Sequence, residues 1–451
     1  MAADRNKILS DSIKRLLRRD ASMHLRKIVN KAHAADLSVV FRGLSVVQQR
    51  RVFDLIKSPG QKGLLLSEID DDLFQDLITD RPLDEIVEIF ETMPTDDVAD
   101  LIGELTPELS GAILERMKNE GSEQVEGLLR YGDDTAGGIM VPDFIALPQD
   151  VTSADAIASL QKEYQNVEMP FYLYVVDEYG HLVGVVSLRQ LVVVTPDTPL
   201  KQFMTTDVFY VTTDMDQEEV ARIVARYDIL AVPVVDLNNI LVGIVTVDDI
   251  IDIIRQEATE DIFKMAGVGG EEFVETKSIG RSTKIRLPWL FASCIGGLVA
   301  FLIIGRFETA LAKVAYLAAF IPVILGMGGN VGTQSSTIVV RGLATGRLNV
   351  RDIWTVVSKE IAVGLILGIT YGVLIGTVAQ LRYPGVMLAV SVGLAVVCSM
   401  TLATLVGSMV PMLFARMGVD PAVATGPFVT TSIDIIAVAL YFLIVTSFLG
   451  V

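Results

Sequence analysis

The chain has 451 residues and a formal net charge of −18, and this length allows more than one domain. Only 8 of the 37 Lys/Arg and 5 of the 55 Asp/Glu lie from residue 287 onward, so that part carries +3 and the first 286 residues carry −21. An acidic half of this size repels nucleic acid and anionic lipid headgroups and attracts cations, so we expect no nucleic-acid partner. The two cysteines, Cys294 and Cys398, lie in apolar stretches and indicate neither a disulfide nor a zinc site. The first 20 residues are charged and lack an apolar core, which argues against a secretory signal.

Residues 1–133 are predicted to form a helical domain. The segments 44–56, 93–105 and 105–117 have similar amphipathic spacing, and the last two begin near a proline of the kind that starts helices. This pattern predicts stacked short helices, whose default role is that of a scaffold.

Residues 134–250 contain an internal repeat. The run LYVVD, which ends at Asp177, recurs as VPVVD ending at Asp236, and each run is followed by a turn, an apolar segment with a central glycine, and a helix. Two copies of one small α/β unit, at 134–200 and 201–250, are expected to pack together because neither buries its apolar face alone.

A connecting helix is predicted within residues 251–280. Apolar residues at positions 251, 254, 258, 262 and 265 fall on one stripe, and acidic residues fall mostly on the opposite face. Such a face is ordinarily solvated surface. Because this helix leads directly to the first apolar span, we expect its charges to have a functional role at the entrance to the membrane part.

Residues 281–451 contain five stretches long enough to cross a bilayer, which takes about 20 apolar residues each. Basic residues flank the first span on its N-terminal side and the loop between the second and third spans, which predicts a cytoplasmic N-terminus and an outside C-terminus. We therefore expect a multi-pass protein of the cell (inner) membrane. The predicted spans are 287–305, 314–340, 361–381, 383–415 and 421–451.

Asp434 is the only charged residue of the last predicted span. A carboxylate at mid-span costs about 2.5–3.5 kcal/mol on insertion scales, so it usually faces a watery path or a partner. The alternative is a protonated aspartate with a structural role.

The second span carries GMGGNVGTQ at residues 326–334, which suits either close helix contact or an opened backbone. We expect Pro322, and Pro427 ahead of the last span, to free backbone carbonyls one turn earlier. Together with the side chains of Asn330 and Thr430, these oxygens are the hard ligands that Mg²⁺ prefers.

These features together resemble the MgtE family of magnesium channels and transporters, from about residue 36 to the end. The most specific motifs are PVILGMGGNVGTQSSTIVVRG at residues 322–342 and GPFVTT at 426–431, ahead of Asp434. The repeat resembles a pair of cystathionine-β-synthase (CBS) domains, and the connecting helix resembles the plug helix of the family.

The resemblance implies a multi-domain membrane protein with an α-helical N-terminal domain, an α/β tandem CBS pair and a five-helix α transmembrane domain. It also implies a homodimer whose pore lies between the chains. By that resemblance Asp434 of both chains holds hydrated Mg²⁺, helped by Asn330 and by backbone oxygens near Thr430 and Gly328. Regulatory Mg²⁺ sites are implied at Asp96 and Asp100, at Glu218 and Asp228 of the second CBS repeat, and at Asp249, Asp252, Glu257, Glu260 and Asp261.

CBS pairs often bind adenine nucleotides, and the resemblance allows ATP in this chain. The Ser/Thr-x-x-Asp ribose pattern is present in the second repeat as Thr246-x-x-Asp249, whereas the first repeat has Gln190 in place of the acid. The residues expected to line the pocket are Tyr172, Ser187 and Arg189.

We therefore expect a channel or transporter for Mg²⁺ uptake, closed when cytosolic Mg²⁺ bridges the acidic surfaces. The sequence has no nucleophile–base pair or phosphate-binding loop, so we do not expect an enzyme. Two alternatives stay open: a transporter for Co²⁺ or other divalent cations and, in another class, a membrane-anchored CBS nucleotide sensor. The lack of His or Cys among the expected pore ligands argues against softer metals, and five spans argue against a simple anchor.

Overall fold

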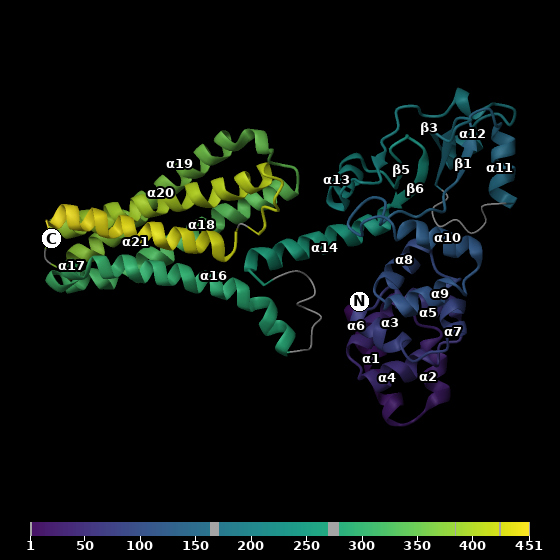
Figure 1. Ribbon diagram of the computed structural model, residues 1–451, viewed down its shortest axis with the longest axis horizontal. Helices are drawn as coiled ribbons and strands as arrows, with labels where there is room; N and C mark the ends of the chain where they lie inside the picture. Colours follow the sequence, from purple (N-terminus) through teal and green to yellow (C-terminus); the bar gives the residue numbers. More distant parts are fainter. Residues whose placement is uncertain (1, 163–170, 269–278, 384, 424, 451) are drawn as a thin grey trace. The chain divides into compact units, whose positions relative to one another are not determined.

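The computed structural model describes residues 2–162, 171–268, 279–383, 385–423 and 425–450, and Figure 1 draws its elements. They form two compact units, Met1–Ile254 and Arg255–Val451. The division falls inside helix α14 (Val247–Ala266), which contributes to both units. The predicted connecting segment includes residues 269–278, which lie outside the described residues.

Ten short helices build the first part of the first unit within the described residues, and this confirms the predicted helical N-terminal domain. All but the first are eight to ten residues long, and helices of this length are marginal in isolation. Their starts are marked locally, by a capping box between Ser45 and Gln48 and by Pro59 and Pro107 in the first turn. The helices are α1 (Ala2–Arg18), α2 (Ser22–Val29), α3 (Ala34–Arg42), α4 (Val46–Phe53), α5 (Pro59–Leu66), α6 (Asp71–Ile78), α7 (Leu83–Phe90), α8 (Thr95–Gly103), α9 (Pro107–Leu114) and α10 (Asn119–Leu128).

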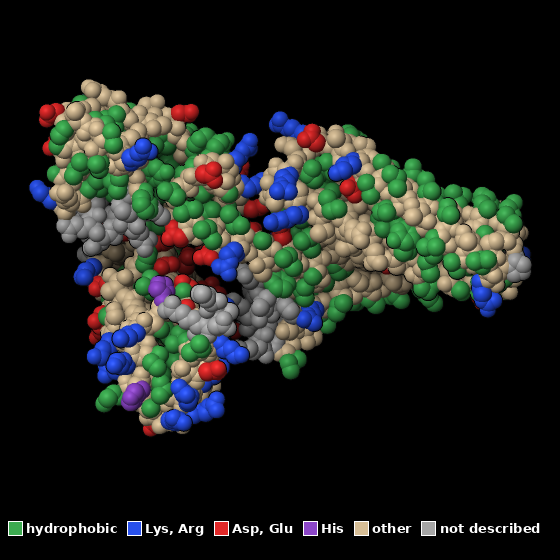
Figure 2. Space-filling model, turned by 180° about the vertical axis from the view of Figure 1, so that it is seen from behind, with side chains coloured by type: hydrophobic (Ala, Val, Ile, Leu, Met, Phe, Trp, Pro, Cys, Tyr) green, Lys and Arg blue, Asp and Glu red, His purple; other side chains and the backbone are tan. Residues whose placement is uncertain are grey.

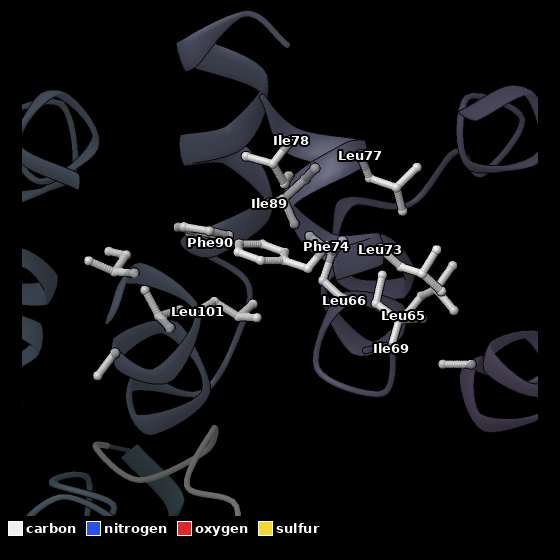
Figure 3. Close-up of a cluster of buried hydrophobic side chains, with 14 of the residues drawn as sticks. Leu65, Leu66, Ile69, Leu73, Phe74, Leu77, Ile78, Ile89, Phe90 and Leu101 are labelled. Atoms are coloured by element: carbon white, nitrogen blue, oxygen red, sulfur yellow. The ribbon is translucent and has the colours of Figure 1, made fainter. Parts of the chain in front are cut away.

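These helices are held together by a shared apolar core (Figure 3). Leu66 of α5, Phe74 of α6 and Phe90 of α7 are almost completely buried and belong to one cluster. Burial of each such side chain contributes about 1.5–3 kcal/mol, which compensates for the low intrinsic stability of the short helices.

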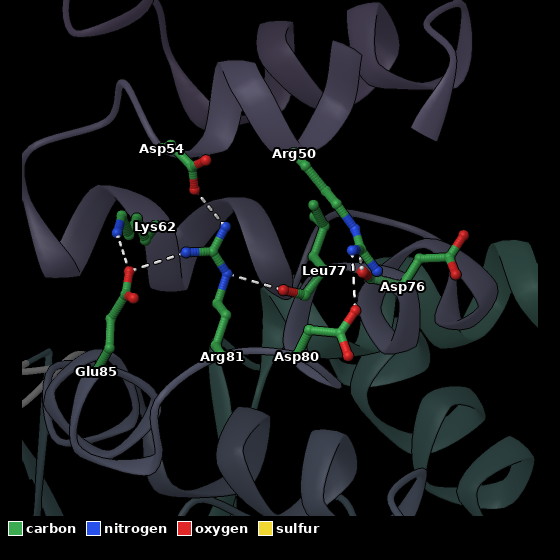
Figure 4. Close-up of polar contacts among 8 residues, drawn as sticks. All are labelled: Arg50, Asp54, Lys62, Asp76, Leu77, Asp80, Arg81 and Glu85. Carbon is green, nitrogen blue, oxygen red and sulfur yellow. Dashed lines mark hydrogen bonds and ion pairs between the residues drawn. The ribbon is translucent and has the colours of Figure 1, made fainter. Parts of the chain in front are cut away.

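A network of ion pairs and hydrogen bonds around the half-buried Arg81 connects α4, α5, α6 and α7 (Figure 4). Arg81 pairs with Asp54 at 2.6 Å and with Glu85 at 3.0 Å, and it donates to the Leu77 carbonyl at 2.8 Å. Lys62 shares Glu85, at 2.5 Å. The Arg81 side chain is only 12% exposed, so this network is screened less by water than a surface ion pair.

Each α/β repeat forms a three-stranded sheet of the same order and directions. The first strand is parallel to the central strand, the third is antiparallel to it, and the register shifts at the end of the central strand in both sheets. The strands are β1 (Ala146–Pro148), β2 (Tyr172–Val176) and β3 (Leu182–Ser187), then β4 (Val211–Thr212), β5 (Ala231–Val235) and β6 (Leu241–Thr246). The accompanying helices are α11 (Ser153–Lys162), α12 (Leu188–Val193), η1 (Leu200–Gln202) and α13 (Gln217–Tyr227).

The two repeats pack together by exchanging equivalent residues. Met140, which precedes the first sheet, packs on Gly243 of β6, and Met204 packs on Gly184 of β3. A methyl group at either glycine would meet the methionine sulfur at 2.6–2.7 Å, so only glycine allows this approach. The expected α/β pair is therefore confirmed.

Among its described residues, the second unit contains five helices long and apolar enough to cross a membrane, with mean hydropathy of 1.5 to 2.3, so the fold is that of a multi-domain membrane protein. Many hydrophobic side chains lie on the visible outer face of this unit (Figure 2). These helices are α16 (Ile279–Arg306), α18 (Ile321–Ala344), α19 (Ile353–Arg382), α20 (Val386–Arg416) and α21 (Pro427–Leu449), with the short α17 (Glu308–Lys313), η2 (Ala315–Phe320) and η3 (Val350–Asp352) between them.

The glycine-rich segment of α18 is a continuous helix that packs closely, rather than an opened backbone. A methyl group on Gly407 of α20 would collide with the carbonyl oxygen of Gly332, so the two helix backbones nearly touch. The expectation that Pro322 and Pro427 free carbonyls inside a helix is wrong. Both lie in the first turn of their helices, where the missing N–H has no intrahelical partner to lose.

Candidate functional site

The carboxylate of Asp434 lies half-buried on α21, opposite the glycines of α18. A methyl group on Gly329 would lie 3.9 Å from Asp434 Oδ1, so the missing side chain leaves the backbone of α18 open to the carboxylate. Asp434 forms no hydrogen bond or ion pair within the described part of the chain. A charge at this position therefore has no partner among those residues, and a cation would supply one.

The other predicted pore residues differ in their surroundings. Gly328 is buried, and a methyl group there would lie 3.1 Å from Ser399 Oγ and 3.3 Å from Ile433 Cγ2, so this position serves helix packing. Thr430 donates its hydroxyl to the carbonyls of Gly426 and Pro427, at 3.3 Å each, which leaves oxygen lone pairs rather than the proton for a ligand.

Asn330 lies on the exposed face of α18, one residue beyond Gly329. Thr333, Gln334 and Thr337 share this face at helical spacing. We call these four side chains the polar stripe of α18. Its amides make no hydrogen bond among the described residues, and a bare amide facing lipid is costly.

A second intramembrane carboxylate was missed from the sequence. Glu360 lies within α19 and is only 6% exposed, and Ser335 of α18 donates a hydrogen bond to it at 2.7 Å. Nearby helices bury two hydroxyls, of Ser336 and Ser399, that have no hydrogen-bond partner in the described chain. The third span was predicted to begin at residue 361 because only uncharged residues were counted, whereas α19 begins at Ile353. The apolar residues at 353, 354, 356 and 357 were the signal that could have indicated the earlier start.

In the first unit, α8 and the start of α14 bring carboxylates together. Partial burial and the charge of Asp249 raise the pKa of Asp97 to about 6. Partial loss of water and the charges of Asp97, Asp133 and Asp249 raise the pKa of Asp100 to about 7. Burial raises the pKa of Asp249 to about 6, although Thr246 donates a hydrogen bond to it. We call Asp97, Asp100 and Asp249 the α8–α14 carboxylates.

Of the predicted regulatory residues, only Asp100 and Asp249 belong to these carboxylates. Asp96 is 9% exposed and is turned inward, and its neighbour Asp97, which was not predicted, takes the facing position. Glu218 is half-buried near the start of α13, and Asp228 is exposed at its C-terminal cap. Within the described ranges, no three His, Cys, Asp or Glu side chains are close enough to hold a metal ion by themselves.

The remaining predicted acidic residues lie along α14. Asp252 is exposed, and Glu257, Glu260 and Asp261 are half-buried. Partial burial and the charge of Asp420 raise the pKa of Asp261.

The C-terminal end of α14 is fastened to the segment that leads into α21. Lys264 pairs with Glu260 at 2.6 Å and with Asp420 at 2.7 Å. A methyl group on Gly426 would lie 3.1 Å from the Met265 carbonyl oxygen, so α14 meets the start of the helix that carries Asp434. Partial burial lowers the pKa of Lys264, but its two hydrogen-bonded carboxylates outweigh this effect and raise it.

The predicted nucleotide residues lie around the end of β3. Ser187 caps α12, and the Gln190 side chain accepts from the Ser187 backbone at 2.8 Å and from its hydroxyl at 2.9 Å. Gln190 thus repeats locally what Asp249 does for Thr246 in the other copy. Tyr172 is half-buried and Arg189 is exposed.

Three family models match the chain in order. The MgtE intracellular N domain covers residues 32–134, the CBS domain covers 136–196 and 200–256, and the MgtE divalent cation transporter covers 321–444. The magnesium transporter MgtE of Thermus thermophilus is 41% identical over 352 residues, which are 77% of this chain and 78% of that protein. The chain belongs to the MgtE family. The magnesium transporter MgtE of Bacillus subtilis is 38% identical over 79% of each protein.

The MgtE likeness extends to solved structures. A crystal structure of the cytosolic domain of the Mg²⁺ channel MgtE in complex with ATP is 34% identical, with a TM-score of 0.52, over 54% of this chain and 99% of that one. The matched MgtE transporter region contains Gly328, Asn330, Thr430 and Asp434. The MgtE N-domain match begins at residue 32, so α1 and α2 precede it.

Proposed function

We propose that this chain carries Mg²⁺ into the cell across the cell membrane, with Asp434 as the ion-binding carboxylate of the pore. The observation that carries the proposal is the carboxylate of Asp434 on a membrane-spanning helix, which has no partner among the described residues and lies beside Gly329 of the neighbouring helix. Mg²⁺ keeps several of its waters when bound, so one carboxylate per chain with amide and carbonyl oxygens nearby suits a hydrated ion. The relatives named magnesium transporters support the same ion.

We propose further that two copies form the pore and that the polar stripe of α18 lines it. Asn330 and Gln334 are exposed on one chain, and lipid cannot satisfy their amides. A second copy, related by two-fold symmetry, would cover this stripe and place two Asp434 carboxylates at one site. Asn330, Thr430 and Gly328 are proposed to supply the further oxygens.

Gating is proposed to act through α14. At low Mg²⁺ the α8–α14 carboxylates repel one another, and their raised pKa values support such repulsion. Bridging Mg²⁺ would stabilise the compact arrangement in proportion to the logarithm of its concentration. At its other end α14 is held by Lys264 beside the start of α21, which gives the change a route to Asp434. Glu218, Asp228, Asp252, Glu257, Glu260 and Asp261, with Asp96, remain proposed outer ligands of hydrated Mg²⁺.

ATP binding at the CBS pair is a secondary proposal, supported by the relative that was crystallised with ATP. Tyr172, Ser187 and Arg189 are the proposed contacts. Gln190 offers an amide where the ribose pattern has a carboxylate, so we expect weaker ribose binding than in a chain with Asp at that position.

The test is divalent uptake into proteoliposomes that hold the purified chain, measured with an internal Mg²⁺ dye as a function of membrane potential. The proposal predicts Mg²⁺ uptake that increases with inside-negative potential and declines as internal Mg²⁺ accumulates. Uptake of Co²⁺ without Mg²⁺ would favour the softer-metal alternative, and nucleotide binding without ion uptake would favour the sensor.

A further inference from the structure

The first two helices present a basic surface on an otherwise acidic unit. From residue 6 to 33, where side chains are described, the exposed positions of α1, α2 and the turns that follow them include seven Lys or Arg and two acidic residues. One of the acidic residues, Asp20, is paired with Arg51. We call these side chains the N-terminal basic patch: Lys7, Arg15, Arg18, Arg19, Arg26, Lys27 and Lys31.

None of the patch residues forms an ion pair with another described side chain. Figure 2 shows blue side chains gathered at the end of the first unit that carries these helices. A basic residue in the last turn of a helix stabilises the helix dipole, and this effect accounts for Arg15, Arg18, Arg26 and Lys27. It does not account for Lys7, which lies away from the C-terminal end of α1.

Two large apolar side chains protrude within the same surface. Ile8 is 67% exposed and Met23 is 83% exposed, whereas Ile13 and Leu25 of the same helices are fully buried in the core. Helices that lie on a bilayer combine such apolar side chains with Lys and Arg. The apolar side chains enter the boundary between headgroups and acyl chains, and the Lys and Arg side chains bind anionic headgroups.

We propose that the N-terminal basic patch docks on an anionic bilayer surface, with phosphatidylglycerol-type headgroups as the ligand. The chain is anchored by its spans, so the bilayer is present at high effective concentration at all times. Single-stranded nucleic acid is the other polyanion to consider, but residues 6–33 contain no Phe, Tyr or Trp on which bases could stack.

The acidic half as a whole is expected to repel anionic lipid, but its net charge includes a local surface of opposite sign. This surface belongs to a segment that precedes the matched MgtE N domain. Its docking on the bilayer rests on the proposed cytoplasmic placement of the first unit.

The experiment uses the full-length chain with Cys294→Ala and Cys398→Ala, and with a fluorophore on Met23→Cys. The protein is placed in nanodiscs of phosphatidylcholine alone or mixed with phosphatidylglycerol, both with headgroup-level lipid quenchers. Nanodiscs expose both bilayer faces, so the reading does not depend on which face is cytoplasmic. We expect strong quenching with phosphatidylglycerol, weak quenching without it, and loss of quenching at high salt.

Two matched variants separate the patch from general charge. Replacing Arg18, Arg19 and Arg26 with Gln should weaken the association with the bilayer by roughly a hundredfold. Each basic side chain near an anionic bilayer contributes about a fivefold increase in affinity, and three are removed. Neutralising Arg130, Arg222 and Arg226, which are exposed elsewhere in the first unit, should leave quenching unchanged. Mg²⁺ uptake by both variants should equal that of the parent, which shows that they are folded and separates this result from the transport proposal.

Equal quenching in both lipid mixtures, or quenching that survives neutralisation of the patch, overturns the proposal. So does retention of single-stranded RNA by the parent and not by the patch variant, together with absence of lipid quenching. That outcome would assign the patch to nucleic acid.

Discussion

Replacing Asp97 with Asn should stabilise the α8 region at alkaline pH and weaken its response to Mg²⁺. The wild-type carboxylate is half-buried, and its pKa is raised from 3.8 to about 6 by burial and by Asp249. A shift of about two units corresponds to about 3 kcal/mol at 1.4 kcal/mol per unit, and screening by nearby water reduces this to about 1–2 kcal/mol. Asn keeps the shape of the side chain and removes the charge.

The sign of the pH dependence follows from the raised pKa. At pH 4 the folded-state carboxyl is largely protonated, so wild type and variant should be equally stable. As the pH rises through about 6 the wild type acquires a charge that the folded state disfavours, and it loses stability. The advantage of the variant should therefore be complete at pH 8, and saturating Mg²⁺ should abolish it by neutralising the same charge.

Hydrogen exchange of the full-length protein, followed by mass spectrometry of peptides from α8 and corrected for intrinsic rates, measures this local stability. Glu126→Gln, an exposed carboxylate on α10, is the control and should leave exchange of α8 unchanged. Equal protection of wild type and Asp97→Asn at pH 8, or lower protection in the variant, would refute the reasoning.

Three further outcomes are expected, two in the melting of detergent-solubilised protein and one in Mg²⁺ uptake by proteoliposomes. Gly407→Ala should destabilise the membrane unit by about 1–3 kcal/mol through overpacking. Gly326→Ala, whose added methyl group would have nothing within 4 Å, should be neutral or stabilising. Equal melting temperatures for the two variants would contradict the packing account. Glu360→Leu should cost about 1–3 kcal/mol because it leaves a buried hydroxyl without its hydrogen-bond acceptor. Glu360→Gln keeps an acceptor oxygen and should melt near wild type, so equally large losses in both variants contradict the hydrogen-bond account. Lys264→Met removes the ion pair between the end of α14 and Asp420, so half-inhibition of uptake should require a higher internal Mg²⁺ concentration. An unchanged midpoint would mean that this ion pair has no part in gating.

The arrangement of elements could largely be predicted from the sequence because it depends on local patterns. The repeat was visible in the runs LYVVD and VPVVD and in the central glycine that follows each, and these glycines prove to receive the methionines that pack the two sheets together. The start of the third span could not be found by counting uncharged residues. Glu360 interrupts the apolar run, yet the helix continues through it. Ser335 of α18 donates a hydrogen bond to the Glu360 carboxyl group and so allows it to be buried.

The candidate site shows the same division between local and tertiary information. Asp434 was identifiable because a lone carboxylate in a span is costly wherever the helix points. The acidic residues of α8 were harder to assign from the sequence. Which of Asp96, Asp97 and Asp100 faces α14 depends on how the helix is rotated about its own axis. That rotation is set by core residues such as Val98 and Ile102, which turn Asp96 inward and Asp97 toward Asp249.

The central claim is that Asp434 binds the ion that crosses the membrane. The most direct measurement is Mg²⁺ uptake into proteoliposomes by wild type and Asp434→Asn at matched protein content, with Asp352→Asn, an exposed acid before α19, as the control. Asn keeps the volume of the side chain and removes the charge, so the variant should have the same size-exclusion profile as wild type but show no uptake above empty liposomes. Uptake by Asp434→Asn at the wild-type rate would contradict the account.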